Sequence, residues 1–518
     1  MKKILYIIIA FGFIFSGCKK DFLDKASLSD ISDGNFWQTK ADAELALMGC
    51  YDGFQDISLY KGNGTTSGAG IASFDAISDD AYSKSSWHRL QALAYGTYDP
   101  TSWGNDQIWA ACYKIISRTN EVIKQVPEIE SLSVEDSKLI VAEAKVLRAT
   151  IYNLLAMTYA DVPLITEPLK AENAQVAKST KSEIMSFIIA DLEACYADLP
   201  EKADKWGRLG QGAALGILAR TYLYNENWAL AASTAQKVID LSVHSLFSNY
   251  STLFTPANEQ NDEVIFPISF EYGLGGEGGA WMKYYSSRMY IRYRTALPSL
   301  VNEFYCTDGL PISTSPLFNS AAIWENRDPR LQATVTSYNW PNWPPTSKSE
   351  PEGVCFANKY IAAPEIKEQT GDSPQDFYLI RYAHILLIKA EALAQQSADA
   401  EIYTLINQLR ARVSMPAIED AEGSGLSQTE LLDVVKHERR VETAFEFLRY
   451  FDIKRWGEIQ EKYNWYNANE YTNHPGGKPG DAYYSGMKER LWYPKYEKMP
   501  IPQAELDANK ALVQHDGY

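Results

Sequence analysis

Three glutamates, Glu438, Glu442 and Glu446, stand four residues apart in the segment "HERRVETAFEFLRYFDIKRW". On one face of a helix, carboxylates at this spacing could act as acid and base in the hydrolysis of a glycosidic bond. Other charged side chains are interleaved with them within helical reach: Arg439, Arg449, Arg455 and Asp452. Ion pairs with these arginines would keep the glutamates ionised, whereas a general acid needs a raised pKa. The spacing therefore predicts structural ion pairs and not an enzyme.

The cysteines and histidines form no motif for a metal or a nucleophile. Besides Cys18, five widely separated cysteines occur without any C-x-x-C: Cys50, Cys112, Cys195, Cys306 and Cys355. The six histidines form no H-E-x-x-H, and neither G-x-S-x-G nor a Walker loop is present. These spacings match none of the motifs of zinc sites, thioredoxin-type sites or hydrolases. Because five is odd, at least one thiol is free, and we expect mostly isolated buried thiols, no metal and no cofactor.

Cys18 lies in "FSGCKKDFLD", directly behind two small residues and at the end of a secretory signal. Lys2 and Lys3 supply the positive start of this signal, and residues 4–15 form an apolar run of 12 residues. A bilayer-spanning helix needs roughly 20 residues, so cleavage is expected. The segment resembles a bacterial lipobox, whose cysteine receives a diacylglycerol, and two or three acyl chains anchor a protein stably. The alternative is a soluble periplasmic protein in which Cys18 is incidental.

Composition excludes one class of partner. The chain has 518 residues, of which 46% are hydrophobic, and a formal net charge of -17 with a pI near 5.0. A chain of this size can bury a substantial core. Binding to nucleic acid requires a basic stripe that displaces counterions, and no run of Lys or Arg longer than a pair occurs. Acidic lipid head groups would also repel the protein, so only a lipid anchor could hold it to a membrane.

Apolar residues at helical spacing predict a mostly α-helical fold. Helices are expected over 35–53, 108–126 and 133–161, and the last one should end at Asp161-Val162-Pro163 because proline cannot continue a helix. A strongly charged helix is expected over 427–456. Residues 55–106 are rich in Gly, Ser and Asp and are expected to be irregular.

Two helical pairs have a spacing typical of tetratricopeptide repeats. In residues 215–241 and again in residues 378–413, one apolar series is followed by a second series twelve positions later. The first pair carries Leu215, Leu218, Ala219 and Tyr222, then Ala231, Ala235 and Val238; the second carries Leu386, Ala390 and Leu393, then Ile402, Ile406 and Leu409. Small residues at such positions let antiparallel helices approach closely. The alternative is two unrelated hairpins, because three- and four-residue spacing alone is common.

Five segments, in this order along the chain, resemble the SusD/RagB family of Bacteroidetes outer-membrane lipoproteins. They are the lipobox with "DFLD", "AEAKVLRATIYNLLAMTYADVPL", "RYAHILLIKAEAL", "ERRVETAFEFLRYFDIKRW" and "PIPQAELDANKALVQHDGY". The resemblance covers the whole chain. Three departures touch packing motifs: Phe447 stands where glycine is common, His384 where glutamate is common, and His515-Asp516 where Asn-Pro is common.

The resemblance implies a mostly α SusD-like fold, with tetratricopeptide-like helical repeats that support an irregular loop-rich subdomain. It divides the chain into a lipoprotein signal peptide (1–17), an N-terminal helical region with repeat units (18–260), a loop-rich insertion (261–374), C-terminal repeat-like helices (375–460) and a tail with the PIP motif (461–518). It implies a binding protein, lipid-anchored in the outer membrane through Cys18 and exposed at the cell surface. Such proteins capture an oligosaccharide and pass it to a SusC-like TonB-dependent transporter, as two copies of each.

Sugar sites in this family are built from aromatic and a few polar side chains in variable loops, so the resemblance locates none. The chain holds 13 Trp, 33 Tyr and 19 Phe. A sugar ring packs its C–H face on an aromatic ring, and its hydroxyls need carboxylates, amides or guanidinium groups. Two irregular stretches carry both ingredients, and we predict ligand contacts from Asp79, Asp80, Trp87, Arg89, Trp103, Asn105, Trp281, Tyr284, Tyr285 and Trp324, with Trp340 and Trp343 as further aromatic candidates. For each aromatic residue, the alternative is a packing role.

Two other functions are compatible with parts of this pattern. The ligand could be a peptide, as for some relatives in the family, and a sugar-versus-peptide binding screen would separate the two. A lipidated glycoside hydrolase would also be rich in aromatic residues, but it would need an unpaired acid in a cleft, and the sequence offers none.

Overall fold

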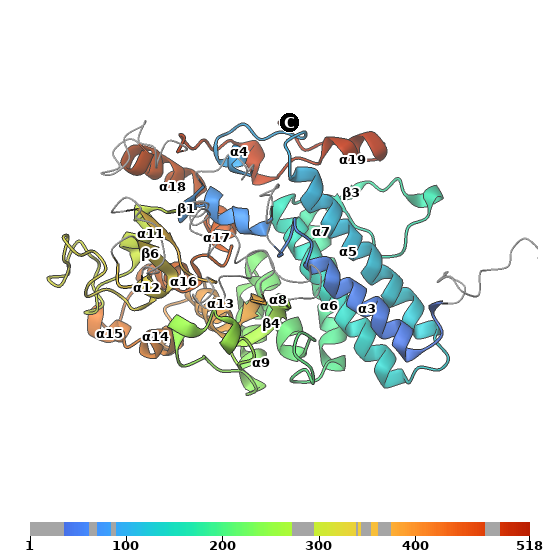
Figure 1. The fold of residues 1–518 in the computed structure, drawn as a ribbon, viewed down its shortest axis with the longest axis horizontal. Helices are drawn as coiled ribbons and strands as arrows, with labels where there is room; N and C mark the ends of the chain where they lie inside the picture. The colour runs from blue at the N-terminus through green and yellow to red at the C-terminus, as the bar shows by residue number, and fades with distance from the viewer. Residues whose placement is uncertain are drawn as a thin grey trace, which may run out of the picture.

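The structure is a computed structural model that describes residues 36–61, 70–83, 90–271, 295–337, 340–342, 354–360, 374–471 and 487–518. These residues are mostly α-helical with short strands, which confirms the predicted fold class (Figure 1). The longer helices are α3 (Lys40–Phe54), α5 (Asn105–Gln125), α6 (Val134–Thr158), α7 (Lys181–Cys195), α8 (Gln211–Tyr224), α9 (Trp228–Asp240), α13 (Tyr382–Ala394), α14 (Ala400–Arg412), α16 (Gln428–Thr443) and α18 (Ile459–Tyr466). The shorter ones are α4 (Gln91–Ala94), α11 (Pro298–Glu303), α12 (Arg330–Thr334), α15 (Ile418–Ala421), α17 (Arg449–Arg455) and α19 (Gln503–Ala508).

Side-chain caps fix where several helices begin. The hydroxyl oxygens of Thr39, Ser133, Thr180 and Ser427 each accept a hydrogen bond from a backbone N–H in the first turn, at the starts of α3, α6, α7 and α16. These bonds satisfy amide groups that have no partner within the helix. α6 and α16 begin within one residue of their predicted starts, and α3 begins five residues after its predicted start.

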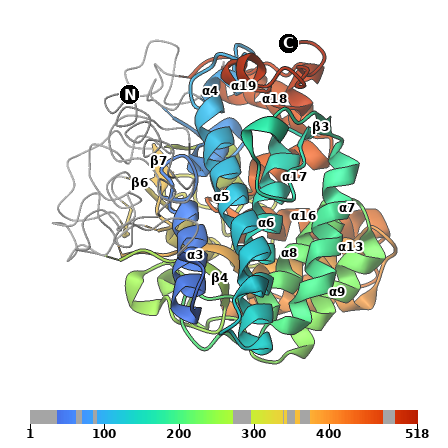
Figure 2. The same ribbon diagram turned by 90° about the vertical axis from the view of Figure 1, so that its right-hand side faces the viewer.

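The two predicted repeat pairs are present as helical hairpins. α8 packs on α9, α13 packs on α14, and α9 also contacts α13, so the pairs stack on one another (Figure 2). Ala219, Ala231 and Ala390 are fully buried at these contacts. Close approach also explains Gly216 on α8, because a Cβ there would lie 3.0 Å from the side chain of Ile380. The small residues therefore set the spacing of the layers, as the sequence pattern predicted.

Short antiparallel strands tie the loop-rich insertion to the helices. β4 (Val264–Ile268) pairs with β8 (Phe377–Arg381), which brings together the two ends of the predicted insertion. A four-stranded sheet joins one strand of the N-terminal region to three strands of the insertion, in the order β1 (Ala81–Tyr82), β5 (Thr295–Ala296), β7 (Cys355–Ala357) and β6 (Val335–Ser337). A third sheet pairs β2 (Val162–Pro163) with β3 (Lys178–Ser179), and the proline stop predicted for α6 is confirmed there.

Residues 427–456 form two helices, so the prediction of one charged helix over this range is wrong. α16 ends at Thr443 and α17 begins at Arg449, because Phe445 and Phe447 adopt left-handed φ angles of 62° and 64°. Such angles are unusual for bulky residues and require support from packing. Phe447 is buried and stacks on Phe377 with ring centroids 5.3 Å apart. A glycine would take this conformation without strain, which is a physical reason for glycine to be common at this position.

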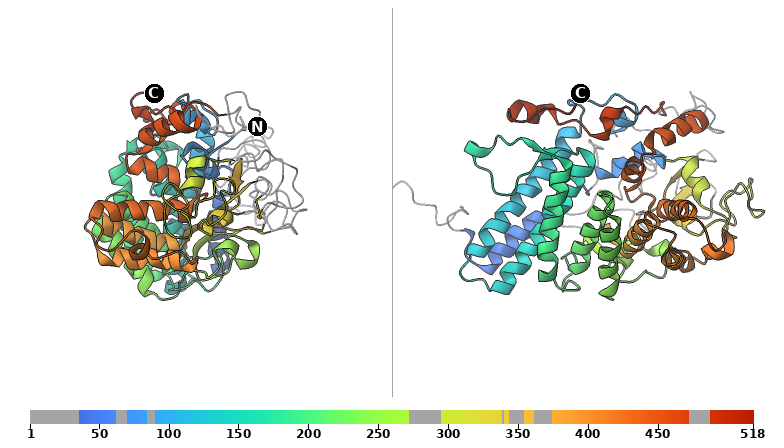
Figure 3. Two further views of the ribbon diagram at one scale, coloured as in Figure 1. Left: turned by 90° about the vertical axis from the view of Figure 1, so that its left-hand side faces the viewer. Right: turned by 180° about the vertical axis from the view of Figure 1, so that it is seen from behind.

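One hydrophobic core extends from α3 to the C-terminal segment, and a smaller core lies under the four-stranded sheet. The C-terminal segment crosses one end of the helices (Figure 3), where Met499 and Ile501 are buried and the backbone N–H of Met499 donates to Thr158 O at 2.9 Å. Among the described residues, no helix combines the length and apolarity that crossing a membrane would require.

Candidate functional site

The glutamates that could have acted as acid and base are buried in ion pairs. Glu438 and Glu442 lie on α16 and Glu446 follows it, and each is at most 2% exposed. Their partners are Arg330 and Arg410 for Glu438, Arg330, Arg381 and Arg412 for Glu442, and Lys359 and Arg381 for Glu446, with N–O distances of 2.5–3.2 Å. The prediction of structural ion pairs is confirmed.

The predicted partners of these glutamates are wrong. The arginines within helical reach turn to other carboxylates: Arg439 to Asp452, Arg449 to Asp79, and Arg455 to Glu391 and Asp452. Arg439 lies on α16 next to Glu438 in the sequence and therefore on another face of that helix, and the break between α16 and α17 removes Arg449 and Arg455 from the face that carries the glutamates. Cations from α12, β8 and α14 occupy that face instead.

The charge cluster holds its carboxylates ionised. Burial alone would raise the pKa of Glu438, but Arg330 and Arg410 outweigh it and lower that pKa to about 2. The same opposition, burial against neighbouring cations, lowers the pKa of Glu442 and Glu446. A general acid needs the reverse shift, so this cluster serves packing and not proton transfer.

Metal and thiol chemistry find no site in the described part of the chain. No group of three or more His, Cys, Asp or Glu side chains there could hold a metal ion. Cys50, Cys112, Cys195, Cys306 and Cys355 are buried and unpaired, as expected. Burial raises the pKa of the Cys195 thiol to about 12, which leaves it unreactive near neutral pH.

Three polar residues predicted to contact the ligand are core residues. Arg449 donates to both carboxylate oxygens of Asp79 at 2.8 Å, and Arg440 Nε donates to Asp80 Oδ1 at 2.8 Å. Asn105 is fully buried and donates through Nδ2 to Pro500 O at 2.9 Å. Residues 55–106 are rich in Gly, Ser and Asp and show no helical periodicity, so the sequence did not indicate that these side chains are buried. Because their side chains are enclosed and engaged with the protein, we do not retain these three as ligand contacts.

The aromatic candidates fall into two groups. Trp103, in the loop between α4 and α5, and Trp324 are partly exposed, and Trp324 packs against the buried Trp340 with ring centroids 5.8 Å apart. The other predicted contacts lie outside the described residues, together with Cys18: Trp87, Arg89, Trp281, Tyr284, Tyr285 and Trp343.

A strand pair brings the two predicted stretches to one place. Tyr82 of β1 and Thr295 of β5 are paired in antiparallel register. The chain therefore leaves β1 towards residues 84–89 and enters β5 from residues 272–294 at the same end of the pair. Tyr82 and Thr295 are more than 200 positions apart in the sequence, so two distant segments join the described structure side by side.

A cavity that the sequence did not indicate opens between α3 and the segment before α8. It has a volume of about 520 Å³ and is lined by Leu45, Met48, Gly49, Tyr51, Asp52, Phe54, Gln55, Trp206, Gly207, Arg208, Phe266, Pro267, Ile268 and Ser269. Ligand sites commonly have volumes of about 300–1,000 Å³ with apolar and aromatic walls. Its aromatic residues come from three separate elements, so no local pattern marked it.

Two family models match the chain. Residues 262–518 match the model described as the SusD family. Residues 21–223 match the model described as "Starch-binding associating with outer membrane". The two matched ranges lie on either side of residues 224–261 and together cover most of the chain.

Relatives resemble the chain over nearly its full length. SusD-like protein P25 of Formosa agariphila is 25% identical over 99% of this chain and 98% of its own. A SusD-like protein of Bacteroides ovatus is 24% identical over 96% of this chain and 90% of its own. A SusD-like carbohydrate-binding protein of Bacteroides fragilis superposes with a TM-score of 0.77 at 26% identity, over 92% of this chain and 100% of its own. A laminarin-binding SusD-like protein has a TM-score of 0.73 at 24% identity, over 93% and 100%.

Proposed function

The chain belongs to the SusD family, and from this premise we propose that it is a surface glycan-binding lipoprotein that passes oligosaccharides to a SusC-like TonB-dependent transporter. One observation carries the proposal: the similarity to the B. fragilis carbohydrate-binding protein extends over 92% of the chain. The ion-paired state of the buried glutamates on α16 supports binding without hydrolysis.

The proposed ligand site lies where the stretches that flank β1 and β5 join the sheet. Its candidate contacts are Trp87, Arg89, Trp103, Trp281, Tyr284, Tyr285 and Trp324. The register of β1 with β5 supports this grouping, because it brings both stretches to one end of the sheet. Aromatic rings from two sides would offer stacking surfaces to successive sugar rings.

The proposal predicts that Trp103→Ala weakens glycan binding. Loss of one stacking ring costs about 1–3 kcal/mol for bases on aromatic side chains, and a similar scale for a sugar gives a roughly ten- to hundredfold loss of affinity. A glycan array followed by calorimetric titration of the selected oligosaccharide measures this loss. Because Trp103 is only partly buried, the thermal midpoint should change little.

Trp228→Ala is the matched control for Trp103→Ala. Trp228 lies at the start of α9, is also partly exposed and is not among the candidate contacts, so its loss should leave the affinity near the wild-type value. The bound oligosaccharide should release no reducing ends above a heat-inactivated sample. Binding to peptides and to no glycan on the array would replace the proposal with its peptide-binding alternative, and turnover would replace it with a hydrolase.

We also expect the membrane location to depend on Cys18. Cys18→Ala removes the sulfur that would carry the lipid, so the protein should stay unprocessed or become soluble, and in either case it should be lost from the outer-membrane fraction. In mild detergent, the wild-type protein should co-purify with a TonB-dependent barrel, as two copies of each. Unchanged processing and unchanged outer-membrane retention of the Cys18→Ala protein would contradict the anchor, and migration of the wild type as a lone monomer would contradict the partner.

A further inference from the structure

None of the described residues that line the cavity between α3 and Trp206 is among the residues assigned above to the glycan site. We propose that it is a second carbohydrate site, which takes an uncharged sugar ring between the indole of Trp206 and the apolar face of α3. This inference rests on the proposed function and adds to it a place and a ligand class. Three features of the cavity support the proposal: the indole of Trp206 is held in place, the charge of Arg208 is neutralised, and the carboxylate of Asp52 is an exposed hydrogen-bond acceptor.

The indole of Trp206 is held in place from behind. Its Nε1 donates to Asp376 Oδ2 at 2.7 Å, and the same oxygen accepts from Ser269 Oγ at 3.2 Å. The other oxygen of Asp376 accepts from the backbone N–H of Phe270 at 2.8 Å. The polar edge of the ring is thus satisfied within the protein while the side chain remains partly exposed. A ring fixed in this way loses little conformational freedom when a sugar stacks on it.

The opposite wall is an apolar helix surface. Leu45 and Met48 on α3 are 60% and 38% exposed, and both line the cavity. Such exposed apolar side chains on a surface helix are available to the C–H groups of a sugar ring.

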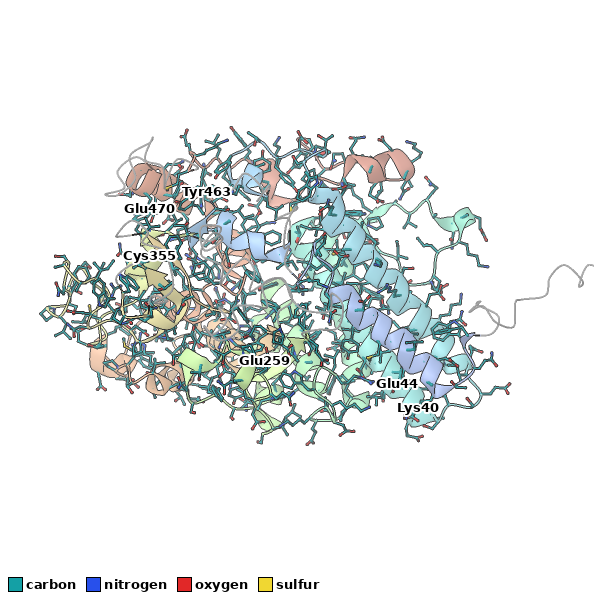
Figure 4. All side chains as sticks on the ribbon, viewed as in Figure 1. Lys40, Glu44, Glu259, Cys355, Tyr463 and Glu470 are labelled. Atoms are coloured by element: carbon teal, nitrogen blue, oxygen red, sulfur yellow. The ribbon has the colours of Figure 1, made fainter. Side chains whose placement is uncertain are left out.

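Arg208 is the one cation among the described residues that line the cavity, and its charge is already neutralised. Arg208 donates through Nε and Nη2 to the two oxygens of Glu143, at 2.7 and 2.5 Å, and through Nη1 to Glu44 at 2.7 Å. Tyr51 donates a further hydrogen bond to Glu143. Glu44 lies on α3, the helix that carries the apolar wall of the cavity, and can be followed in Figure 4. An anionic sugar would meet more negative than positive charge here, so the ligand class is neutral.

A hydroxyl-bearing ligand finds an acceptor at the rim. The carboxylate of Asp52 is 57% exposed and is oriented by Arg118 Nη1 at 2.8 Å. Gly207 has a φ of 84°, and a Cβ there would lie 3.1 Å from Ser269 Oγ, so glycine lets the turn between Trp206 and Arg208 close against β4. An aromatic face beside a carboxylate acceptor is the combination that a sugar ring requires and a purely apolar ligand does not.

A glycan array that carries neutral, uronate-bearing and sulfated oligosaccharides identifies a neutral oligosaccharide that binds. The trisaccharide of that oligosaccharide is then the probe for calorimetric titration. We expect two binding events in the wild type, of which Trp206→Ala weakens one by roughly tenfold or more. Leu45→Glu should weaken the same event by roughly threefold without affecting the fold, because Leu45 is exposed. Leu230→Glu, on an exposed leucine of α9, is the matched control and should bind as the wild type does.

The outcomes separate this inference from the proposed function. If a neutral oligosaccharide binds and both Trp206→Ala and Leu45→Glu bind it like the wild type, the second site is overturned and the proposed function stands. If no oligosaccharide binds the wild type, the proposed function fails and the inference fails with it. If only uronate-bearing or sulfated oligosaccharides depend on Trp206, the assigned ligand class is wrong.

Discussion

Glu442→Ala should lower the free energy of unfolding by about 3–5 kcal/mol, because it removes one member of a buried ion-pair cluster. Glu442 is fully buried and joins three guanidinium groups: Arg381 at 2.7 Å, Arg412 at 2.6 Å and Arg330 at 3.2 Å. Without it, three enclosed cations would share fewer carboxylates. Denaturant unfolding at neutral pH, followed by the change in helix signal, measures the loss.

The buried part of the cluster is balanced in charge, which is why one deletion should cost so much. It pairs five cations with five carboxylates: Arg330, Lys359, Arg381, Arg410 and Arg412 with Glu263, Asp328, Glu438, Glu442 and Glu446. The partly exposed Glu422 also pairs with Arg410 at the edge of the cluster. Replacement of the whole cluster by apolar residues could be neutral, whereas removal of one partner leaves an enclosed charge uncompensated. We infer that its role is to fix how α12, β8 and α14 dock on α16.

Two variants make the test of Glu442 specific to burial. Lys202 and Asp262 form an ion pair of 2.6 Å, as short as Glu442–Arg412, but their side chains are 59% and 57% exposed. Lys202→Ala should therefore cost less than about 1 kcal/mol. Glu442→Gln keeps the shape and an acceptor oxygen and should fall between the two. A loss below about 1 kcal/mol for Glu442→Ala would contradict the argument.

Local patterns predicted the helical pairs well because their cause is local. Ala219 and Ala231 stand twelve positions apart, and both the periodicity within each helix and the short turn between helices lie inside that window. The same holds for Ala390 and Ile402. Family resemblance added the placement of these pairs in a larger fold, which periodicity could not supply.

The partners of the charged residues could not be predicted, because they are distant in the sequence. Glu442 and Arg412 are 30 positions apart, and Arg449 and Asp79 are 370 positions apart. Helical reach indicates only pairs three or four positions apart, and of the predicted set only Arg455–Asp452 is of this kind. The helix break at Phe445 and Phe447 contains no Gly or Asn, the residues that usually mark a turn. The sequence therefore did not indicate that the residues after the break leave the face of α16.

The cavity escaped prediction for a related reason. Trp206 lies in "KWGRLG", a short turn without periodicity, and its significance depends on Asp376, which is 170 positions away. Glycine followed by arginine is a weak signal by itself. A tryptophan held by a buried carboxylate becomes recognisable only when both are placed in space.

Acid should destabilise the protein between pH 4.5 and about 2. The pKa of Glu438, lowered to about 2 by Arg330 and Arg410 against the effect of burial, lies below the value of 4.5 expected in the unfolded chain. A carboxylate with a lowered pKa stabilises the fold above its unfolded pKa, and this stabilisation disappears as pH falls through the folded value. For Glu438 alone this is on the order of 3 kcal/mol. Glu303, whose pKa is also lowered to about 2, acts in the same direction.

Glu259 should produce the opposite dependence on the alkaline side, and Glu259→Gln should remove it. Burial and then the charge of Asp376 raise the pKa of Glu259 to about 9. The folded protein therefore holds a proton that the unfolded chain has lost, so stability declines as pH rises from 4.5 to about 9. Glutamine keeps the acceptor for the backbone N–H of Asp376 but does not ionise. Thermal midpoints from pH 3 to pH 9 should show the acid limb unchanged and the alkaline limb flattened in this variant. Glu461→Gln, on a side chain that is 76% exposed, is the matched control and should retain both limbs. An alkaline limb as steep in Glu259→Gln as in the wild type would show that another group sets it.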